Sequence, residues 1–338
     1  MDRSFGVIIV CCMGDFSYAK GAVASVRHFM PGVPVCLLID GPFYPEKFIR
    51  RYDLDCINRP RIRDPFLREH ARGSSVTKMI ALWESPYERF LLMDADTVLW
   101  GDVRPLADFS RYDFIADVGP ERLTPEEMNR YMFDPELVKA YQPDFEPAGL
   151  RYFCAGVFFG TRGLIPIEEF RRFIKRQRES TLFKCDDQGW LNFMLLYGRQ
   201  TGRLRLDRQR IQFVVSDYTR EETRLMFGSA PGERPAGPVV IHWAGSVNPL
   251  WRRRGETWAE PMFYFRRMLL AEAGLRFAPA QNACMWWEEW TSALPKTARR
   301  NALAAKWAAY GFAKAALRKL LGNSLGGRAI GVLRRFRV

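Results

Sequence analysis

Two carboxylates, Asp94 and Asp96, follow an apolar run in the stretch Phe90-Leu-Leu-Met-Asp-Ala-Asp-Thr-Val-Leu99. In an extended segment, residues i and i+2 point to the same side, so both carboxylates leave one face of a strand at its carboxyl end. Open α/β sheets bind ligands at that edge. Two neighbouring carboxylates repel each other unless a cation lies between them, and hard divalent cations prefer such oxygen ligands. The pattern predicts a metal site, although caps and turns also use this spacing.

Three more motifs follow along the chain, namely Phe153-Cys-Ala-Gly-Val157, Asp186-Asp-Gln-Gly-Trp190 and Ile241-His-Trp-Ala-Gly-Ser-Val-Asn-Pro-Leu-Trp251. In this order and at these distances the four motifs resemble glycosyltransferase family 8, the retaining enzymes with a GT-A fold that include glycogenin and bacterial lipopolysaccharide galactosyltransferases. The resemblance covers residues 5–255, about three quarters of the chain. It is strongest at the Asp-x-Asp strand and at the His-x-x-Gly-x-x-x-Pro-x-Trp stretch.

The resemblance implies that Asp94, Asp96 and His242 bind one Mn²⁺ or Mg²⁺, which bridges the two phosphates of a nucleotide-sugar. A metal neutralises the charge that develops on a diphosphate leaving group without a proton transfer. His242 ends the apolar run Val239–Ile241, so its imidazole can reach the same edge. The alternative for a single histidine is a structural side chain.

The resemblance also implies a set of residues that bind the donor. They are Asp15, Tyr18, Lys78, Ala95, Cys154, Ala155, Gly156, Gly245 and Asn248. Asp15 would contact the base of uridine and Tyr18 would stack on it, or Asp15 caps the helix Ser17–Phe29, and both roles are compatible. Lys78 is either a basic contact to the donor or a surface lysine. Gly245 suits a close approach of the backbone to phosphate.

Two positions depart from the family pattern and leave the donor sugar open. Asn248 stands where the family has a phosphate-binding lysine, and Cys154 stands where it has an asparagine that contacts the donor sugar. The run Arg252–Arg254 is either a substitute for that lysine or a solvated basic patch. Asp187 and Gln188 match the family's catalytic pair near the anomeric carbon, or else they form the acidic first turn of a helix.

Charge is unevenly distributed over the 338 residues, which have a net charge of +13. Lys296–Val338 contains eleven Lys or Arg and no Asp or Glu, so the rest of the chain has 40 basic and 38 acidic residues. This asymmetry argues against a nucleic-acid partner and predicts a tail that binds an anionic membrane surface. Seven cysteines without a Cys-x-x-Cys pair, no leader pattern and no long apolar segment predict a cytoplasmic protein, peripheral on the inner face of the membrane.

Short apolar runs alternate with amphipathic stretches, which predicts a mostly parallel sheet flanked by helices. The expected strands are Phe5–Cys12, Val33–Ile39, Phe90–Met93, Phe114–Asp117, Phe153–Phe159 and Val239–Trp243. The expected helices are Tyr18–Phe29, Ser75–Trp83, Ile167–Arg178 and Asp186–Tyr197, and long loops are expected at Pro120–Pro147 and Ala230–Pro238. Residues 1–274 are expected to form a GT-A-like catalytic domain, and residues 275–338 a helical, Trp-rich and basic C-terminal region. Trp286, Trp287 and Trp290 lie at helical spacing, as packing residues or as a sugar-stacking face.

The function expected from these features is a metal-dependent transfer of a hexose from a nucleotide diphosphate-sugar, most simply a UDP-sugar, to a saccharide or lipid-linked acceptor. Retention of configuration is implied by the resemblance alone. Two alternatives stay open. One is a catalytically inactive GT-A-like binding protein, because Cys154 and Asn248 depart from the pattern. The other is a sugar-phosphate nucleotidyltransferase, although Cys11–Tyr18 lacks the Gly-rich basic loop usual in that class.

Overall fold

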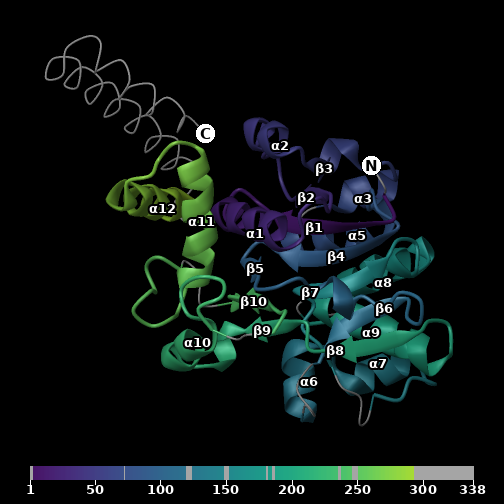
Figure 1. Cartoon of the computed structure of the whole chain (residues 1–338). Coiled ribbons are helices and arrows are strands. Elements are labelled where there is room, and N and C mark those ends of the chain that lie inside the picture. Colours follow the sequence, from purple (N-terminus) through teal and green to yellow (C-terminus); the bar gives the residue numbers. More distant parts are fainter. Residues whose placement is uncertain are drawn as a thin grey trace, which may run out of the picture.

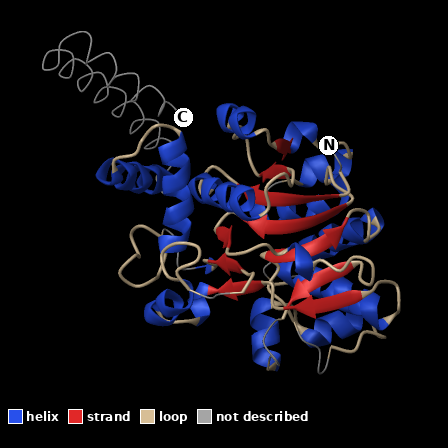
Figure 2. Ribbon diagram, viewed as in Figure 1, coloured by secondary structure: helices blue, strands red, loops and turns tan. Residues whose placement is uncertain are grey.

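The structure is a computed structural model and describes residues 3–71, 73–118, 124–147, 152–179, 182–184, 187–234, 237–245 and 250–292. A seven-stranded sheet lies at its centre, in the order β3-β2-β1-β4-β7-β6-β8 (Figures 1 and 2). The strands of this sheet are β1 (Phe5–Cys11), β2 (Val35–Ile39), β3 (Asp55–Asn58), β4 (Arg89–Asp94), β6 (Phe114–Asp117), β7 (Val157–Thr161) and β8 (Leu206–Gln209). A smaller sheet in the order β5-β10-β9 contains β5 (Thr97–Leu99), β9 (Gln212–Val214) and β10 (Val240–His242).

The large sheet is mostly parallel, as the sequence predicts. Strands β3, β2, β1 and β4 run parallel to one another, and β8 runs parallel to β6, while β7 lies antiparallel between β4 and β6. In this register Val10 of β1 pairs with Asp94, the last residue of β4. The segment that follows β1 therefore begins beside the Asp-x-Asp motif, at the edge where α/β sheets bind ligands.

Helices pack on both faces of the large sheet. The helices of the described residues are α1 (Phe16–Phe29), α2 (Glu46–Tyr52), α3 (Pro65–His70), α4 (Ser74–Met79), α5 (Ala81–Glu84), α6 (Pro125–Tyr131), α7 (Pro135–Tyr141), α8 (Ile167–Glu179), α9 (Asp187–Gln200), α10 (Arg220–Phe227), α11 (Glu260–Glu272) and α12 (Ala278–Ser292). Val7 and Ile9 of β1 pack with α1 and α11, whereas Ile8 and Val10 belong to the core that includes α8 and α9. Burial on both faces explains why the central strands are continuously apolar.

Three predicted segments differ from the structure. The strand expected at Phe153–Phe159 begins only at Val157, and Ser75–Trp83 is divided between α4 and α5. The loop expected at Pro120–Pro147 contains α6 and α7. Each of these helices begins with a capping residue followed by proline, a start signal that the Pro-rich composition obscured. The short strands β3, β5, β8 and β9 were not predicted.

Helix α12, the last helix of the described residues, packs against α11 and α1, and these three helices lie together in Figure 1. Met285 of α12 is fully buried in the same core as α1. The expected domain boundary after residue 274 stays a prediction, and the basic tail Lys296–Val338 lies outside the described residues. Among the helices of the described residues, none has the length and apolar character that crossing a membrane requires.

Candidate active site

The Asp-x-Asp motif forms the turn between β4 and β5. Asp94 is the last residue of β4, and its backbone N–H donates to the Gly156 carbonyl at 2.9 Å. The Thr97 hydroxyl donates to the Asp94 carbonyl at 2.7 Å, and the Trp243 N–H donates to the Asp96 carbonyl at 3.0 Å. Hydrogen bonds with Thr97 of β5, with Gly156 just before β7 and with Trp243 just after β10 therefore fix the turn that holds both carboxylates.

His242 ends β10 and completes the cluster. It pairs with Thr97 across the small sheet and is 3% exposed. Its Nε2 atom lies 3.5 Å from Asp96 Oδ1 and 4.0 Å from Asp94 Oδ2. Asp94, Asp96 and His242 each offer one ligand atom, and these atoms all lie within 4.8 Å of one another. Two carboxylate oxygens and one imidazole nitrogen form a donor set that suits Mn²⁺ or Mg²⁺.

Lys78 and Asp187 lie next to this cluster. The Lys78 ammonium is 2.9 Å from Asp94 Oδ1 and 2.9 Å from Asp187 Oδ2, and it also donates to the Ala155 carbonyl at 3.4 Å. Lys78 is 7% exposed, so the alternative that it is a surface lysine is wrong. Helices α4 and α9 therefore bring the predicted basic residue and the first residue of the predicted Asp-Gln pair to the end of β4.

Side chains of α9 hold the segment before β7. Gln188 Oε1 accepts a hydrogen bond from the Ala155 N–H at 3.0 Å, and Asn192 pairs with both backbone groups of Phe153. These contacts replace the strand pairing expected for the segment. A Cβ atom at Gly156 would lie 2.3 Å from His242 Cε1 and 3.0 Å from Asp94 Oδ2, so only glycine allows both side chains to pack here.

The charges of the site are unbalanced. Burial raises the pKa of Asp94 and Asp96 raises it further, although Lys78 and His242 oppose the shift. Burial lowers the pKa of Lys78 and of His242, but neighbouring groups outweigh it and both are raised, Lys78 by Asp94 and Asp187 and His242 by Asp96 and Cys154. The three carboxylates of Asp94, Asp96 and Asp187 outnumber the Lys78 ammonium, and they still outnumber the cationic groups when the imidazole is protonated, so the formal charge of the group is negative. A divalent cation would balance that charge.

Asp15 lies near the same edge, after β1. Its Oδ1 atom accepts from the Cys12 N–H at 2.6 Å, and the side chain makes no capping bond to α1, although Asp15 occupies the N-cap position. Burial raises the pKa of Asp15 to about 6, and the charges of Asp96 and Asp94 act in the same direction. Asp15 therefore belongs to the electrostatic environment of the Asp-x-Asp motif.

Tyr18 lies deeper than its expected role requires. It is 4% exposed, its hydroxyl accepts from the Leu250 N–H at 3.0 Å, and the Arg266 guanidinium lies 5.7 Å from its ring centre. The ring offers no open face for a nucleotide base in this structure. Tyr18 instead connects α1 to Leu250, near the end of the His242 motif.

The remaining predicted residues have varied positions. Ala95 is buried in the turn between β4 and β5, and Gly245 adopts a φ of 69°, a conformation that favours glycine. Asn248 lies outside the described residues. Arg253 pairs with Glu256, and Arg254 lies over the Trp251 ring.

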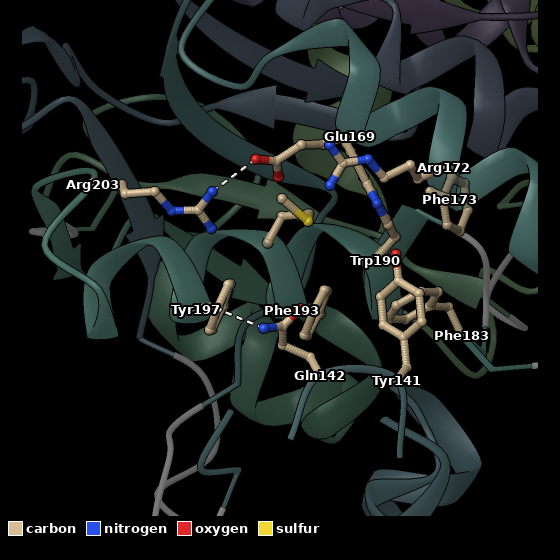
Figure 3. Close-up of a pocket in the computed structure, with 11 residues that line it drawn as sticks. Tyr141, Gln142, Glu169, Arg172, Phe173, Phe183, Trp190, Phe193, Tyr197 and Arg203 are labelled. Carbon is tan, nitrogen blue, oxygen red and sulfur yellow. Dashed lines mark hydrogen bonds and ion pairs between the residues drawn. The ribbon is translucent and has the colours of Figure 1, made fainter. Parts of the chain in front are cut away.

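Two cavities are lined by described residues outside the Asp94–Asp96–His242 cluster. A cleft of about 880 Å³ is lined by residues that follow β2 and β3, among them Asp40, Pro42, Arg59 and Pro60, and its volume is typical of small-molecule sites. A second cavity, drawn in Figure 3, lies among α7, α8 and α9 and contains the Glu169–Arg203 ion pair. Its volume of about 70 Å³ is too small for a hexose.

Gln212 is a site residue that sequence reasoning missed. It is 4% exposed, and its Oε1 atom lies 2.8 Å from His242 Nδ1. The only sequence signal is one polar residue inside the apolar run Ile211–Val215, and β9 is too short to be recognised from its pattern. Tertiary contact between β9 and β10 was needed to connect this residue to the metal motif.

No family model matches this sequence, and no curated protein sequence matches it. Solved structures do match the fold. The galactosyltransferase LgtC, solved with donor and acceptor sugar analogues, matches with a TM-score of 0.51 and 14% identity over 77% of this chain and 94% of that one. The glycosyltransferase GlyE of Streptococcus pneumoniae TIGR4 matches with a TM-score of 0.51 and 16% identity over 78% of this chain. The bifunctional glycosyltransferase WbbM matches with a TM-score of 0.51 and 13% identity over 78% of this chain.

The match spans 60% of the GlyE chain and 50% of the WbbM chain. At identities this low, structural matches show that the fold is shared. They do not show that this chain uses the substrates of those proteins. The mostly parallel α/β architecture agrees with the GT-A expectation drawn from the four motifs. The resemblance to glycosyltransferase family 8 is therefore confirmed at the level of fold: this chain has the GT-A fold of these glycosyltransferases.

Proposed function

We propose that this protein is a metal-dependent glycosyltransferase that transfers a hexose from a nucleotide diphosphate-sugar, in the first instance a UDP-sugar, to a saccharide or lipid-linked acceptor. One observation carries the proposal. Asp94, Asp96 and His242, which are separated by up to 148 positions in the sequence, place their ligand atoms within 4.8 Å of one another at the ligand-binding edge of a GT-A sheet. A structural histidine or an ordinary turn would not require this convergence.

The three side chains fit a divalent cation. Two carboxylates and a buried imidazole supply hard oxygen ligands and one nitrogen, and the excess negative charge of the site favours a cation. When bound, Mn²⁺ or Mg²⁺ would stabilise the negative charge that develops on the diphosphate as the bond to the sugar breaks. The turn between β4 and β5 holds the two carboxylates in place before the donor arrives, so little reorganisation is needed.

Lys78 and Asp187 form the side of the site where we place the sugar. The buried Lys78 ammonium lies 2.9 Å from Asp187 Oδ2 and orients this carboxylate. An ionised carboxylate beside the anomeric carbon stabilises the positive charge of an oxocarbenium-like transition state. Gln188 keeps the Ala155 N–H in place, so the Cys154–Gly156 segment forms a fixed wall of the site. A retaining outcome is part of this proposal and rests on the resemblance alone.

The cleft after β2 and β3 is the proposed nucleoside site. Thr77 Oγ1 and the Gly73 N–H both donate to Asp40 Oδ1, and the next residue of α4, Lys78, reaches Asp94. One turn of α4 therefore lies between the cleft and the metal ligands. This spacing suits a nucleotide whose base lies in the cleft and whose diphosphate reaches Asp94. In this proposal the cleft, and not Tyr18, binds the base.

The experiment that tests the proposal is a sugar-nucleotide hydrolysis and transfer assay on the full chain, with a panel of UDP- and GDP-sugars and with Mn²⁺, Mg²⁺ or EDTA. We expect release of the nucleoside diphosphate from at least one UDP-sugar, dependent on metal, and loss of this release in Asp187→Asn. Binding of a UDP-sugar without turnover would favour the inactive binding protein instead. Formation of a sugar nucleotide from a sugar phosphate and a nucleoside triphosphate would favour the nucleotidyltransferase.

A further inference from the structure

The additional site residue, Gln212, is the first residue of β9. Strand β9 runs parallel to β10, with Gln212 opposite Val240 and Val214 opposite His242. Paired residues of neighbouring strands point to the same face, and so do residues two apart in one strand. Gln212 and His242 therefore leave the same face of the small sheet from neighbouring strands, offset by two residues. Both are almost fully buried.

Three hydrogen bonds fix the position of Gln212. Its Oε1 atom lies 2.8 Å from His242 Nδ1, and its Nε2 atom donates to the Cys154 carbonyl at 3.3 Å. Its backbone N–H donates to Asp117 Oδ1 at 3.0 Å. Gln212 therefore connects the histidine of the metal cluster to the segment that precedes β7.

The chemistry of these partners determines where the protons lie. A carbonyl oxygen only accepts, so the Gln212 NH₂ group must face Cys154 and its oxygen must face His242. An amide oxygen also only accepts, so His242 Nδ1 must carry a hydrogen. In a neutral imidazole this arrangement leaves the lone pair on Nε2, which is the atom 3.5 Å from Asp96 Oδ1.

The other side of the ring is also constrained. A Cβ atom at Gly156 would lie 2.3 Å from His242 Cε1 and 2.9 Å from Nδ1, so the backbone of the Cys154–Gly156 segment lies directly against the imidazole. That segment contacts the ring at Gly156 and orients the Gln212 amide through the Cys154 carbonyl. The Cys154–Gly156 segment therefore fixes both the plane of the His242 ring and its tautomer.

We propose that Gln212 is a positioning residue of the metal site, which holds His242 in the Nδ1–H tautomer and so directs the Nε2 lone pair at the cation. This inference rests on the proposed function, because it requires that Asp94, Asp96 and His242 bind a metal. Histidine ligands in proteins generally donate their second ring N–H to such a partner, and loss of the partner weakens metal binding about 10- to 100-fold.

The first test titrates Mn²⁺ alone into the full chain and measures the free ion by electron paramagnetic resonance. Gln212→Met keeps the length of the side chain and removes both hydrogen bonds, so we expect about 10- to 100-fold weaker Mn²⁺ binding. The matched control is Gln281→Met. Gln281 is also a buried amide, 6% exposed, and it donates to the carbonyls of Arg267 and Leu275 near α12, away from the site. This control should bind Mn²⁺ with wild-type affinity.

A second variant separates an effect on His242 from a general structural role. Gln212→Glu keeps an acceptor for the Nδ1 hydrogen and loses the donor to the Cys154 carbonyl. If Gln212 acts through His242, the glutamate variant binds Mn²⁺ at least as tightly as wild type, because a carboxylate is the stronger partner. If Gln212 only fixes the position of the Cys154 carbonyl, the glutamate variant binds Mn²⁺ as weakly as Gln212→Met does, and the proposal is overturned.

Nitrogen NMR of histidine-labelled protein gives an independent readout without any substitution at Gln212. The chain has three histidines, so His242→Ala identifies the signals of His242. In the Mg²⁺-loaded wild-type protein we expect a protonated Nδ1 and an unprotonated Nε2. A protonated Nε2, or equal Mn²⁺ affinity in Gln212→Met and wild type, overturns the inference alone. Failure of the wild-type protein itself to bind Mn²⁺ instead refutes the proposed metal site, and the inference with it.

Discussion

At the scale of single residues, the two carboxylates of the Asp-x-Asp motif are in different surroundings. Asp94 is held by Lys78 at 2.9 Å, whereas Asp96 approaches the His242 ring at 3.5 Å. A substitution at Asp96 therefore removes a proposed metal ligand without breaking the buried Lys78 ion pairs. It is the cleaner position at which to test the metal.

We predict that Asp96→Asn abolishes Mn²⁺ binding and metal-dependent turnover while the protein stays folded. Relief of repulsion between carboxylates and loss of the contact with His242 oppose each other, so the thermal midpoint without metal should change little. Asp102→Asn is the control, because Asp102 pairs with Arg104 after β5 and lies outside the cluster. Turnover by the wild-type protein after exhaustive chelation would refute the metal requirement.

Asp15 gives a prediction for pH. Its pKa in the folded protein is about 6, against 3.8 for the free side chain, because burial disfavours the charged form. The folded state therefore binds more protons than the unfolded state between these values, and stability falls as pH rises from about 4 through 6. Asp15→Asn has no carboxyl group that titrates at this position, so its free energy of unfolding should not fall in this way. As pH rises from about 4 to about 6, the free energy of unfolding of Asp15→Asn minus that of wild type should therefore increase by on the order of 2 kcal/mol. Urea unfolding in EDTA at several pH values measures this difference, and a difference that does not vary with pH would contradict it.

At the scale of elements, buried charge fixes helix α12 against α1 and α11. Arg266 of α11 is 2% exposed and contacts both Glu288 and Glu289, and Lys20 of α1 reaches Glu288 at 2.7 Å. Burial alone would raise the pKa of Glu288, but Lys20 and Arg266 outweigh it and lower the pKa to about 2. Glu289 also accepts from the Trp251 N–H at 2.7 Å, so α12 supports the end of the His242 motif.

We predict that Arg266→Leu destabilises the protein by about 3–5 kcal/mol, because it leaves the Glu289 carboxylate, which is 1% exposed, without its charged partner. Arg267→Leu is the matched control on the same helix. Its partner Glu260 is about one third exposed, and loss of such a pair should cost about 1 kcal/mol or less. Chemical denaturation of both variants makes the comparison. Equal losses would mean that the buried cluster contributes no more than a surface ion pair.

At the scale of the whole molecule, α12 presents aromatic side chains outward while its acidic residues point inward. Trp286 is 43% exposed and Trp290 is 37% exposed, and their rings stack at 6.0 Å. The basic segment Lys296–Val338 follows in the sequence. Tryptophan is typical of membrane interfaces and clustered basic residues bind anionic lipid, so both features agree with the expected contact between the C-terminal region and a membrane.

We predict that a chain ending at Leu294 loses binding to anionic vesicles and keeps hydrolysis of the UDP-sugar, because the four motifs end at Trp251. Each Lys or Arg near an anionic surface contributes about 1 kcal/mol. The full chain should dissociate from anionic vesicles as the salt concentration rises, and it should not bind neutral vesicles. Vesicle sedimentation measures both properties. Sedimentation of the shortened chain with anionic vesicles would exclude the tail as the anchor.

The sequence by itself determined the fold class and most of the candidate site. The apolar runs that end in Asp94 and in His242 predicted two strands that point functional groups at one edge, because periodicity and strand ends are local properties. Asp187 and Lys78 were reached only through the resemblance to glycosyltransferase family 8. Helices α6 and α7 were missed because a Pro-rich segment was read as loop, although Thr124 and Asp134 are ordinary start signals.

Only the tertiary structure decided which side chains meet. The family resemblance implies that Tyr18 stacks on a base, yet Tyr18 is buried and contacts Arg266 and Leu250. Gln212 has no local sign of function, and its contact with His242 exists because a three-residue strand pairs with β10. Burial and partner choice depend on groups that are distant in sequence, so composition and spacing do not specify them. The sequence therefore predicted the ligands of the proposed metal, and the packing of the two sheets determined how those ligands are oriented.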